Sequence, residues 1–193
     1  MKGKIFVISA PSGTGKTTIQ RLLLEAMPSL KSVITYTTRK PRDSEKNNVD
    51  YKFLTEKDFK EKIKNGEFLE YANVYGNFYG TPKKDVMEKL KKGENILLVI
   101  DTQGGMSVKK IFPDVVLIGI LPPSAKEQEK RLRKRGDVSR KGIKKRLEAA
   151  RDERKILLKY YNYRVINKEI GKTVEKIKKI IEKHLKKGVK KNE

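Results

Sequence analysis

Short apolar runs alternate with longer amphipathic stretches along most of this chain. The apolar runs are rich in β-branched residues and almost continuous, which is typical of strands buried on both faces of a parallel sheet. They cover 4–9, 95–101, 114–121 and 163–167. Apolar positions with the helical period cover 17–27, 82–92, 124–134, 142–161 and 170–185. This alternation predicts an α/β fold, with a parallel sheet and helices on both of its faces.

Two stretches and the C-terminal end depart from this alternation. Residues 36–81 are polar and aromatic, with two short strand-like pieces around one helical piece, which predicts a small inserted subdomain. Residues 135–142 have no apolar anchor and predict a mobile surface loop, while 188–193 predict a frayed basic tail. The remaining segments, 1–35, 82–134 and 143–187, form the core of a single domain, as expected for 193 residues.

Composition restricts the compartment and the kinds of site. At 36% hydrophobic residues the chain can bury a real core, and because it has no cysteine, disulfides and thiolate metal sites are excluded. No apolar run approaches the ~20 residues needed to span a bilayer. The basic, then apolar beginning is too short in its apolar part for a secretory signal, and a buried first strand explains it better. We therefore expect a soluble cytoplasmic protein without membrane association.

The charge balance is strongly basic, with 47 Lys and Arg against 24 Asp and Glu, a net charge of +23. Such a field attracts polyanions, including nucleotides and nucleic acids. The basic residues are spread along the chain with few aromatic residues between them, which favours solvated helix faces over a nucleic-acid surface. Nucleic-acid binding is thus not expected, although the charge leaves it open.

The segment ISAPSGTGKTT, residues 8–18, almost matches the phosphate-loop pattern G-x-x-x-x-G-K-[ST], with Ala10 in place of the first glycine. Because Pro11 follows, residue 10 is restricted to extended conformations with negative φ. Glycine's freedom is therefore not needed there, and alanine fits without strain.

The other features of a phosphate-binding loop are present. Gly13 and Gly15 allow the backbone to wrap around a phosphate, Lys16 supplies a positive charge, and Thr17 supplies a hydroxyl for Mg²⁺. A buried strand precedes the loop and a helix follows it, so the helix N-terminus points at the anion. The segment thus predicts a nucleotide-binding loop of the P-loop NTPase type.

Further segments follow this loop in a characteristic order and spacing. They are TYTTRKPR (35–42), VDYKF (49–53), GEFLEYANVYGNFYGTP (66–82), LLVIDTQGG (97–105), ILPPS (120–124), RLRKRG (131–136) and IKKRLEAARDE (143–153). With the loop, they resemble the guanylate kinase family, whose members transfer the γ-phosphoryl group of ATP to GMP. The resemblance covers nearly the whole chain and implies that 36–81 binds GMP and that 135–142 is a lid.

For the acceptor, the resemblance implies a phosphate clamp and a base pocket. Two guanidinium forks, from Arg39 and Arg42, suit a dianionic monophosphate. The carboxylate of Glu70 suits guanine, whose N1–H and N2–H₂ are adjacent donors. The implied GMP-binding residues are Thr35, Arg39, Arg42, Tyr51, Glu70, Tyr79, Thr81 and Asp101. Activity on dGMP is expected as well.

For ATP, the resemblance implies a Mg²⁺ ion bound with the nucleotide near Thr17 and arginines that close over the triphosphate. The implied ATP-binding residues are Ala10, Pro11, Ser12, Gly13, Thr14, Gly15, Lys16, Thr17, Thr18, Arg131, Arg135 and Asn167. Lys16, Arg39, Arg135 and Arg146 are the implied catalytic residues, which neutralise charge on the transferred group. One departure is Val99, which stands where many members have an acidic residue.

Three other functions remain open. Guanylate-kinase-like domains in scaffolding proteins bind peptides without catalysis, but they typically lack the intact phosphate loop seen here. A related kinase with another acceptor, such as a ribose bisphosphate, is expected to lack most of the insert that this chain carries. Nucleic-acid binding rests on the charge alone, and a steep fall of affinity with salt would be its signature.

Overall fold

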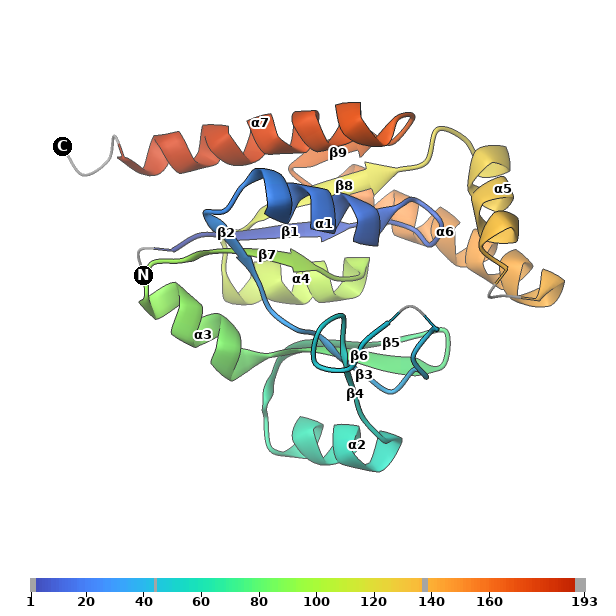
Figure 1. Ribbon diagram of the computed structural model, residues 1–193, viewed down its shortest axis with the longest axis horizontal. Helices are drawn as coiled ribbons and strands as arrows, with labels where there is room; N and C mark the ends of the chain where they lie inside the picture. Colours follow the sequence, from blue (N-terminus) through green and yellow to red (C-terminus); the bar gives the residue numbers. More distant parts are fainter. Residues whose placement is uncertain (1–2, 44, 137–138, 190–193) are drawn as a thin grey trace.

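The computed structural model describes residues 3–43, 45–136 and 139–189, without the side chains of 135 and 187–189 (Figure 1). Of the predicted tail, 188–193, the first two residues do not fray but continue the C-terminal helix, and 190–193 lie outside the described residues. Among those that are described, no helix is long and apolar enough to cross a lipid bilayer.

The core is a parallel sheet of five strands in the order β2-β7-β1-β8-β9. Four of its strands were predicted: β1 (Ile5–Ser9), β7 (Asn95–Val99), β8 (Val116–Leu121) and β9 (Tyr163–Ile166). The fifth, the edge strand β2 (Leu30–Ser32), was not predicted, because three residues are too few to establish a period. The predicted α/β class is confirmed.

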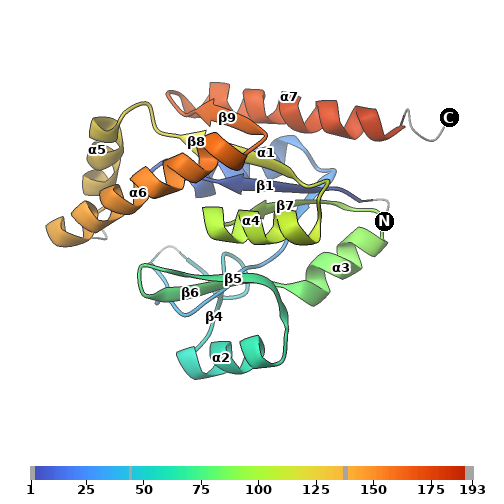
Figure 2. The ribbon, with the colours of Figure 1, turned by 180° about the vertical axis from the view of Figure 1, so that it is seen from behind.

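Helices cover both faces of this sheet, as predicted (Figures 1 and 2). They are α1 (Lys16–Ala26), α3 (Lys83–Lys91), α4 (Thr102–Ile111), α6 (Arg140–Tyr160) and α7 (Ile170–Val189), whereas α5 (Ala125–Arg135) lies beyond the ends of the strands, against α6. Phe6 and Ile8 of β1 pack towards α1 and α7, whereas Ile5 and Val7 pack towards α3, α4 and α6. Alternate residues of one strand thus serve two separate apolar cores.

The segment predicted as an insert forms a sheet of its own, with the strand order β4-β3-β6-β5. Its elements are β3 (Tyr36–Thr37), β4 (Lys52–Phe53), α2 (Glu56–Lys64), β5 (Phe68–Val74) and β6 (Asn77–Pro82). Phe59 of α2 is fully buried and stacks on Phe68 and Phe78, with ring centroids 4.5 and 5.4 Å apart. This aromatic cluster explains how so polar a segment folds, and β5 also contacts α3 and α4 of the core.

The boundaries of the predicted loop 135–142 require correction. Helix α5 continues to Arg135, and Gly136 ends it in the left-handed conformation with φ of 74°. Helix α6 begins at Arg140, two positions earlier than predicted, because the hydroxyl of Ser139 accepts a hydrogen bond from the Gly142 N–H at 3.2 Å. Residues 137–138, at the centre of the predicted loop, lie outside the described part of the chain.

Candidate nucleotide-binding site

The phosphate loop joins β1, the central strand of the core sheet, to α1. Gly13 and Gly15 have φ values of 82° and 92°, which residues with side chains rarely adopt. Ala10 has a negative φ, like every described non-glycine residue except Asn48 and Tyr75, as expected from the proline that follows it. The N-terminus of α1 has no side-chain cap, so its first N–H groups and its positive dipole end face the concavity of the loop.

Three elements of the core brace this loop. From α5, Gln128 Nε2 donates to the carbonyl of Ser12 at 2.8 Å. From α6, Arg146 Nη1 donates to the Ser12 hydroxyl at 3.1 Å. From the end of β9, Asn167 Nδ2 donates to the carbonyl of Thr14 at 2.7 Å. The backbone that would cradle a phosphate is therefore held in place by side chains of the core.

Asn167 is fully buried behind the loop rather than open to a ligand. Its Oδ1 accepts a hydrogen bond from the Thr173 hydroxyl at 3.0 Å, so both ends of the amide are engaged. Its carbonyl accepts from Arg131 Nη2 at 3.2 Å, and Arg131 Nε pairs with Glu127 Oε1 at 3.0 Å. These two predicted ATP-site residues form one network at the back of the loop.

Lys16 is half-buried beside two carboxylates. Burial lowers the pKa of its ammonium group, and the negative charges of Glu153 and Asp101 oppose that shift. Burial also raises the pKa of Glu153 to about 7, with Lys16 opposing the shift and Asp101 adding to it. Within the described residues, Glu153 Oε2 is buried without a hydrogen-bond partner. Sequence reasoning missed this residue, whose only signal is its place seven positions after Arg146 on the same face of α6.

The predicted base-recognition residues do lie together. Glu70 on β5 is 5% exposed, and its Oε1 accepts a hydrogen bond of 2.5 Å from the Thr81 hydroxyl on β6. Burial raises the pKa of Glu70 to about 7; the Thr81 bond opposes this shift and the nearby charge of Asp101 adds to it. Asp101 caps α4, where its Oδ1 accepts from the N–H groups of Gln103 at 2.7 Å and Gly104 at 3.1 Å.

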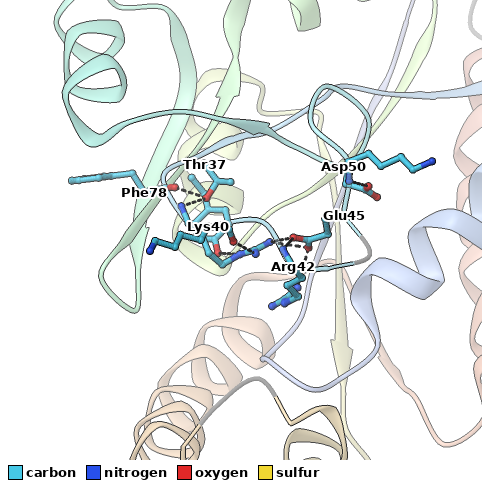
Figure 3. Close-up of polar contacts among 9 residues, drawn as sticks. Thr37, Lys40, Arg42, Glu45, Asp50 and Phe78 are labelled. Carbon is cyan, nitrogen blue, oxygen red and sulfur yellow. Dashed lines mark hydrogen bonds and ion pairs between the residues drawn. The ribbon is translucent and has the colours of Figure 1, made fainter.

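The predicted phosphate clamp is built around a residue that the sequence did not single out, Glu45. Arg39 Nη2 contacts both carboxylate oxygens of Glu45 at 2.8 Å, and Arg42 contacts them through Nη1 at 3.1 Å and its backbone N–H at 2.9 Å (Figure 3). Arg39 Nε also donates to the Tyr79 hydroxyl at 3.2 Å, and the guanidinium carbon lies 5.4 Å from the centre of the Tyr51 ring. The clamp thus brings together four of the predicted residues.

The remaining predicted residues are placed as follows. Thr35 lies between β2 and β3, half-buried, and its carbonyl accepts a hydrogen bond from the Lys52 N–H at 3.0 Å. Thr17 and Thr18 are exposed in the first turn of α1. Arg135 ends α5, and its side chain lies outside the described part of the structure.

The residues present fit a magnesium ion that arrives with a nucleotide. Among the described residues, no group of three His, Cys, Asp or Glu side chains is placed to hold a metal by itself. Mg²⁺ usually takes one or two protein oxygens together with phosphate oxygens and waters. The exposed hydroxyl of Thr17, at the mouth of the loop, is a ligand of this kind.

A central parallel strand that leads through a glycine-rich loop into a helix defines a P-loop nucleotide-binding protein. A protein-family model described as guanylate kinase matches residues 2–184. The guanylate kinase of Caldanaerobacter subterraneus subsp. tengcongensis is 46% identical over 93% of this chain and 87% of its own length. That of Fusobacterium nucleatum is 45% identical over 95% of this chain and 98% of its own. The chain therefore belongs to the guanylate kinase family, whose known reaction is the transfer of the γ-phosphoryl group of ATP to GMP.

Comparison with solved structures agrees with this family assignment. The crystal structure of guanylate kinase from Anaplasma phagocytophilum is similar to this chain with a TM-score of 0.78 and 34% sequence identity. The match covers 95% of this chain and 86% of that one, so it includes the core and the insert together.

Proposed function

We propose that this chain phosphorylates GMP and dGMP with the γ-phosphoryl group of Mg²⁺-bound ATP, to give ADP and the nucleoside diphosphate. The observation that carries the proposal is the pairing of Glu70 with Thr81 in the same insert as the clamp of Arg39 and Arg42. One small subdomain holds a group suited to guanine and a group suited to a monophosphate. A binding module or a kinase with another acceptor has no need of both.

On the acceptor side, the ionised carboxylate of Glu70 accepts hydrogen bonds from the adjacent N1–H and N2–H₂ of guanine. Adenine presents an acceptor at N1, which would face the carboxylate and be repelled. The guanidinium groups of Arg39 and Arg42, with the hydroxyls of Tyr51 and Tyr79, bind the phosphate and fix its position. A single phosphate oxygen is thereby directed towards the donor nucleotide.

On the donor side, the phosphate loop and Lys16 bind the triphosphate, while Arg146, Arg131 and Arg135 surround it with positive charge. A GMP phosphate oxygen forms a bond to the γ-phosphorus as the bond to the departing ADP oxygen breaks. The arginines and Lys16 neutralise the charge that develops on the transferred group and on ADP. Mg²⁺, held near Thr17, supplies further neutralisation when ATP is bound.

The insert, 36–81, and the connection 135–142 are the parts that we expect to move. Their closure over both nucleotides would exclude the water that otherwise takes the phosphoryl group. Arg39 lies in the first segment and Arg135 in the second, so closure would bring both guanidinium groups towards the reacting atoms.

A steady-state assay with ATP and Mg²⁺ tests the proposal, with GMP, dGMP, AMP, IMP, UMP and dTMP as acceptors. We expect turnover with GMP and dGMP, and little with IMP, which lacks the 2-amino donor. Glu70→Gln should weaken GMP binding far more than ATP binding. Turnover with none of the acceptors would contradict the proposal and favour a binding module. Equal turnover with AMP would contradict the role of Glu70.

A further inference from the structure

The tip of the β5–β6 hairpin is a two-residue turn of unusual composition. Val74 pairs with Asn77 across the hairpin, and the two residues between them, Tyr75 and Gly76, have φ values of 53° and 83°. A turn with two positive φ values favours Asn, Asp or Gly at its first central position, because a bulky side chain is strained there. Backbone strain of this kind is often found at functional sites, where the strained residue has a role.

The Tyr75 ring contacts a residue from a different part of the molecule. The guanidinium carbon of Arg146, on α6 of the core, lies 5.3 Å from the centre of the ring, in a cation–π contact. Figures 1 and 2 show the hairpin tip reaching towards α6, away from the body of its own sheet. Tyr75 is thus a point of contact between the insert and the helix that carries a proposed catalytic arginine.

Arg146 also contacts the phosphate loop. Its Nη1 donates to the Ser12 hydroxyl at 3.1 Å, so its guanidinium group lies between the loop and the Tyr75 ring. Glu153, two helical turns further along α6, adds a negative charge near the same ring. Partial burial raises the pKa of the Tyr75 phenol to about 12, with Glu153 adding to the shift and Arg146 opposing it. Like an ordinary tyrosine, the phenol is neutral at physiological pH, so its ring can act as a cation–π partner.

The same hairpin carries the acceptor site. Glu70 lies on β5, and Tyr79 and Thr81 lie on β6, within one pair of antiparallel strands. Any displacement of these strands on GMP binding would also displace the turn at their end. The contact between that turn and Arg146 would then couple the acceptor site to the geometry at the phosphate loop.

We propose that Tyr75 is a positioning residue, whose ring holds the Arg146 guanidinium over the phosphate loop when the insert is in place. The proposal rests on the proposed function, because it assigns Arg146 to the transferred phosphoryl group. Tyr75 itself need not touch either nucleotide. Its loss should lower kcat rather than raise the KM for GMP.

The decisive substitution is Tyr75→Asn, because it removes the ring and gives the turn a residue that it favours. The thermal midpoint should stay the same or rise. We expect kcat to fall about tenfold, because loss of a cation–π contact of this kind changes the equilibrium between a positioned and an unpositioned guanidinium by about that factor. Tyr75→Phe keeps the ring and should keep the kcat of the unsubstituted protein. In an Arg146→Ala background, Tyr75→Asn should cause no further loss.

A matched control is Tyr160→Asn. Tyr160 is another exposed tyrosine with a cationic partner, Lys159, at 5.2 Å from its ring centre, but both residues lie at the end of one helix. This variant should leave kcat unchanged.

A second measurement, by NMR spectroscopy, detects the contact between Tyr75 and Arg146 independently of catalysis. The Arg146 Nε–H resonance, assigned by Arg146→Lys, should shift in Tyr75→Asn and stay in place in Tyr75→Phe. An unchanged resonance or an unchanged kcat in Tyr75→Asn would overturn the proposal, as would an equal loss of kcat in the Arg146→Ala background. Absence of GMP phosphorylation by the unsubstituted protein would instead contradict the proposed function, and the resonance would still decide whether Tyr75 positions Arg146.

Discussion

The carboxylate of Glu70, on the insert, lies directly against Gly104, on the first turn of α4 in the core. A Cβ atom added at Gly104 would lie 3.0 Å from Glu70 Cδ and closer still to Oε2. The glycine is therefore needed for space and not for an unusual φ. Because Gly104 has no side chain, the proposed base-recognition group, Glu70, can approach the backbone of α4.

Gly104→Ala should consequently displace the Glu70 carboxylate and weaken GMP binding, whereas ATP binding should not change. We expect the KM for GMP to rise about tenfold, the cost of one misplaced buried hydrogen-bonding group. Steady-state kinetics with each nucleotide varied in turn would measure this. Gly171→Ala is the control, because nothing lies within 4 Å of a Cβ at that helical position. Equal KM values for GMP in the two variants would refute the steric argument.

Protonation of Glu70 should make stability depend on pH. Burial raises its pKa from 4.5 to about 7, so the folded state retains a proton that the unfolded chain has released. The stabilisation is complete below pH 4.5 and is lost as the pH rises through 7. Relative to Glu70→Gln, the unfolding free energy should fall by roughly 3 kcal/mol across this window. Urea unfolding of both proteins from pH 4.5 to 8 tests this. The titration of Glu153 contributes equally to both proteins and cancels in the difference. Parallel curves of unfolding free energy against pH would disprove the prediction.

GMP binding should show the opposite trend. Only the ionised carboxylate of Glu70 can accept from both guanine donors, so affinity should increase as the pH rises from about 6 to 8. The phosphate of GMP also titrates, near the lower end of this range. In Glu70→Gln, only this phosphate contribution to the pH dependence of binding remains. Calorimetric titration of the two proteins at several pH values gives the difference. A pH dependence that is the same in both would show that Glu70 binds guanine without titrating.

The strands and helices that the sequence predicted are those whose burial has a regular period. Strands β1, β7 and β8 are almost continuous apolar runs, because helices cover both of their faces, whereas the edge strand β9 fully buries only Val165. Helix α4 was missed, since its sequence TQGGMSVKKI has two adjacent glycines and few apolar positions. Tertiary contacts explain it: both glycines give room to buried side chains, Glu70 and Tyr161.

The same distinction holds for the candidate site. The phosphate loop could be predicted because its chemistry lies within one short segment of fixed spacing. Glu153 and Tyr75 could not, because their roles depend on contacts with residues that are distant in the sequence, and Glu45 could not, because nothing in its loop segment shows that its carboxylate turns back onto Arg39 and Arg42. Glu153 is brought to Lys16, and Tyr75 to Arg146, from distant parts of the chain. No local pattern distinguishes such residues from other charged or aromatic surface positions.

Asn167 should matter for stability and for ATP. Asn167→Ala removes the hydrogen bond to the carbonyl of the fully buried Thr14 and the bond from the Thr173 hydroxyl, which keeps the Glu169 carbonyl as an acceptor at 2.9 Å. We expect a loss of about 2 kcal/mol in unfolding free energy and a higher KM for ATP, but not for GMP. The matched control is Asn162→Ala, since Asn162 Oδ1 accepts from the Leu117 N–H at 2.8 Å, away from the loop. It should lose similar stability and keep its KM for ATP. Similar KM values for ATP in both variants would count against the bracing role.

Glu45 should organise the phosphate clamp before GMP binds. Burial alone would raise its pKa, but hydrogen bonds from the Arg42 backbone and the Arg39 guanidinium hold that pKa below its usual range. Glu45→Gln keeps the size of the side chain and removes the charge that both arginines share. The KM for GMP should rise roughly fivefold with little change in kcat, since the arginines lose their fixed orientation.

Glu67→Gln provides the comparison, because Glu67 pairs with Lys62 at 2.9 Å on the exposed side of the insert. Its KM for GMP should be that of the unsubstituted protein. Tighter GMP binding by Glu45→Gln would reverse the interpretation, because the carboxylate would then be a competitor that the phosphate must displace from Arg39 and Arg42. The two possibilities predict changes of opposite direction in the KM for GMP. This substitution therefore tests directly whether Glu45 orients the two arginines or competes with the phosphate for them.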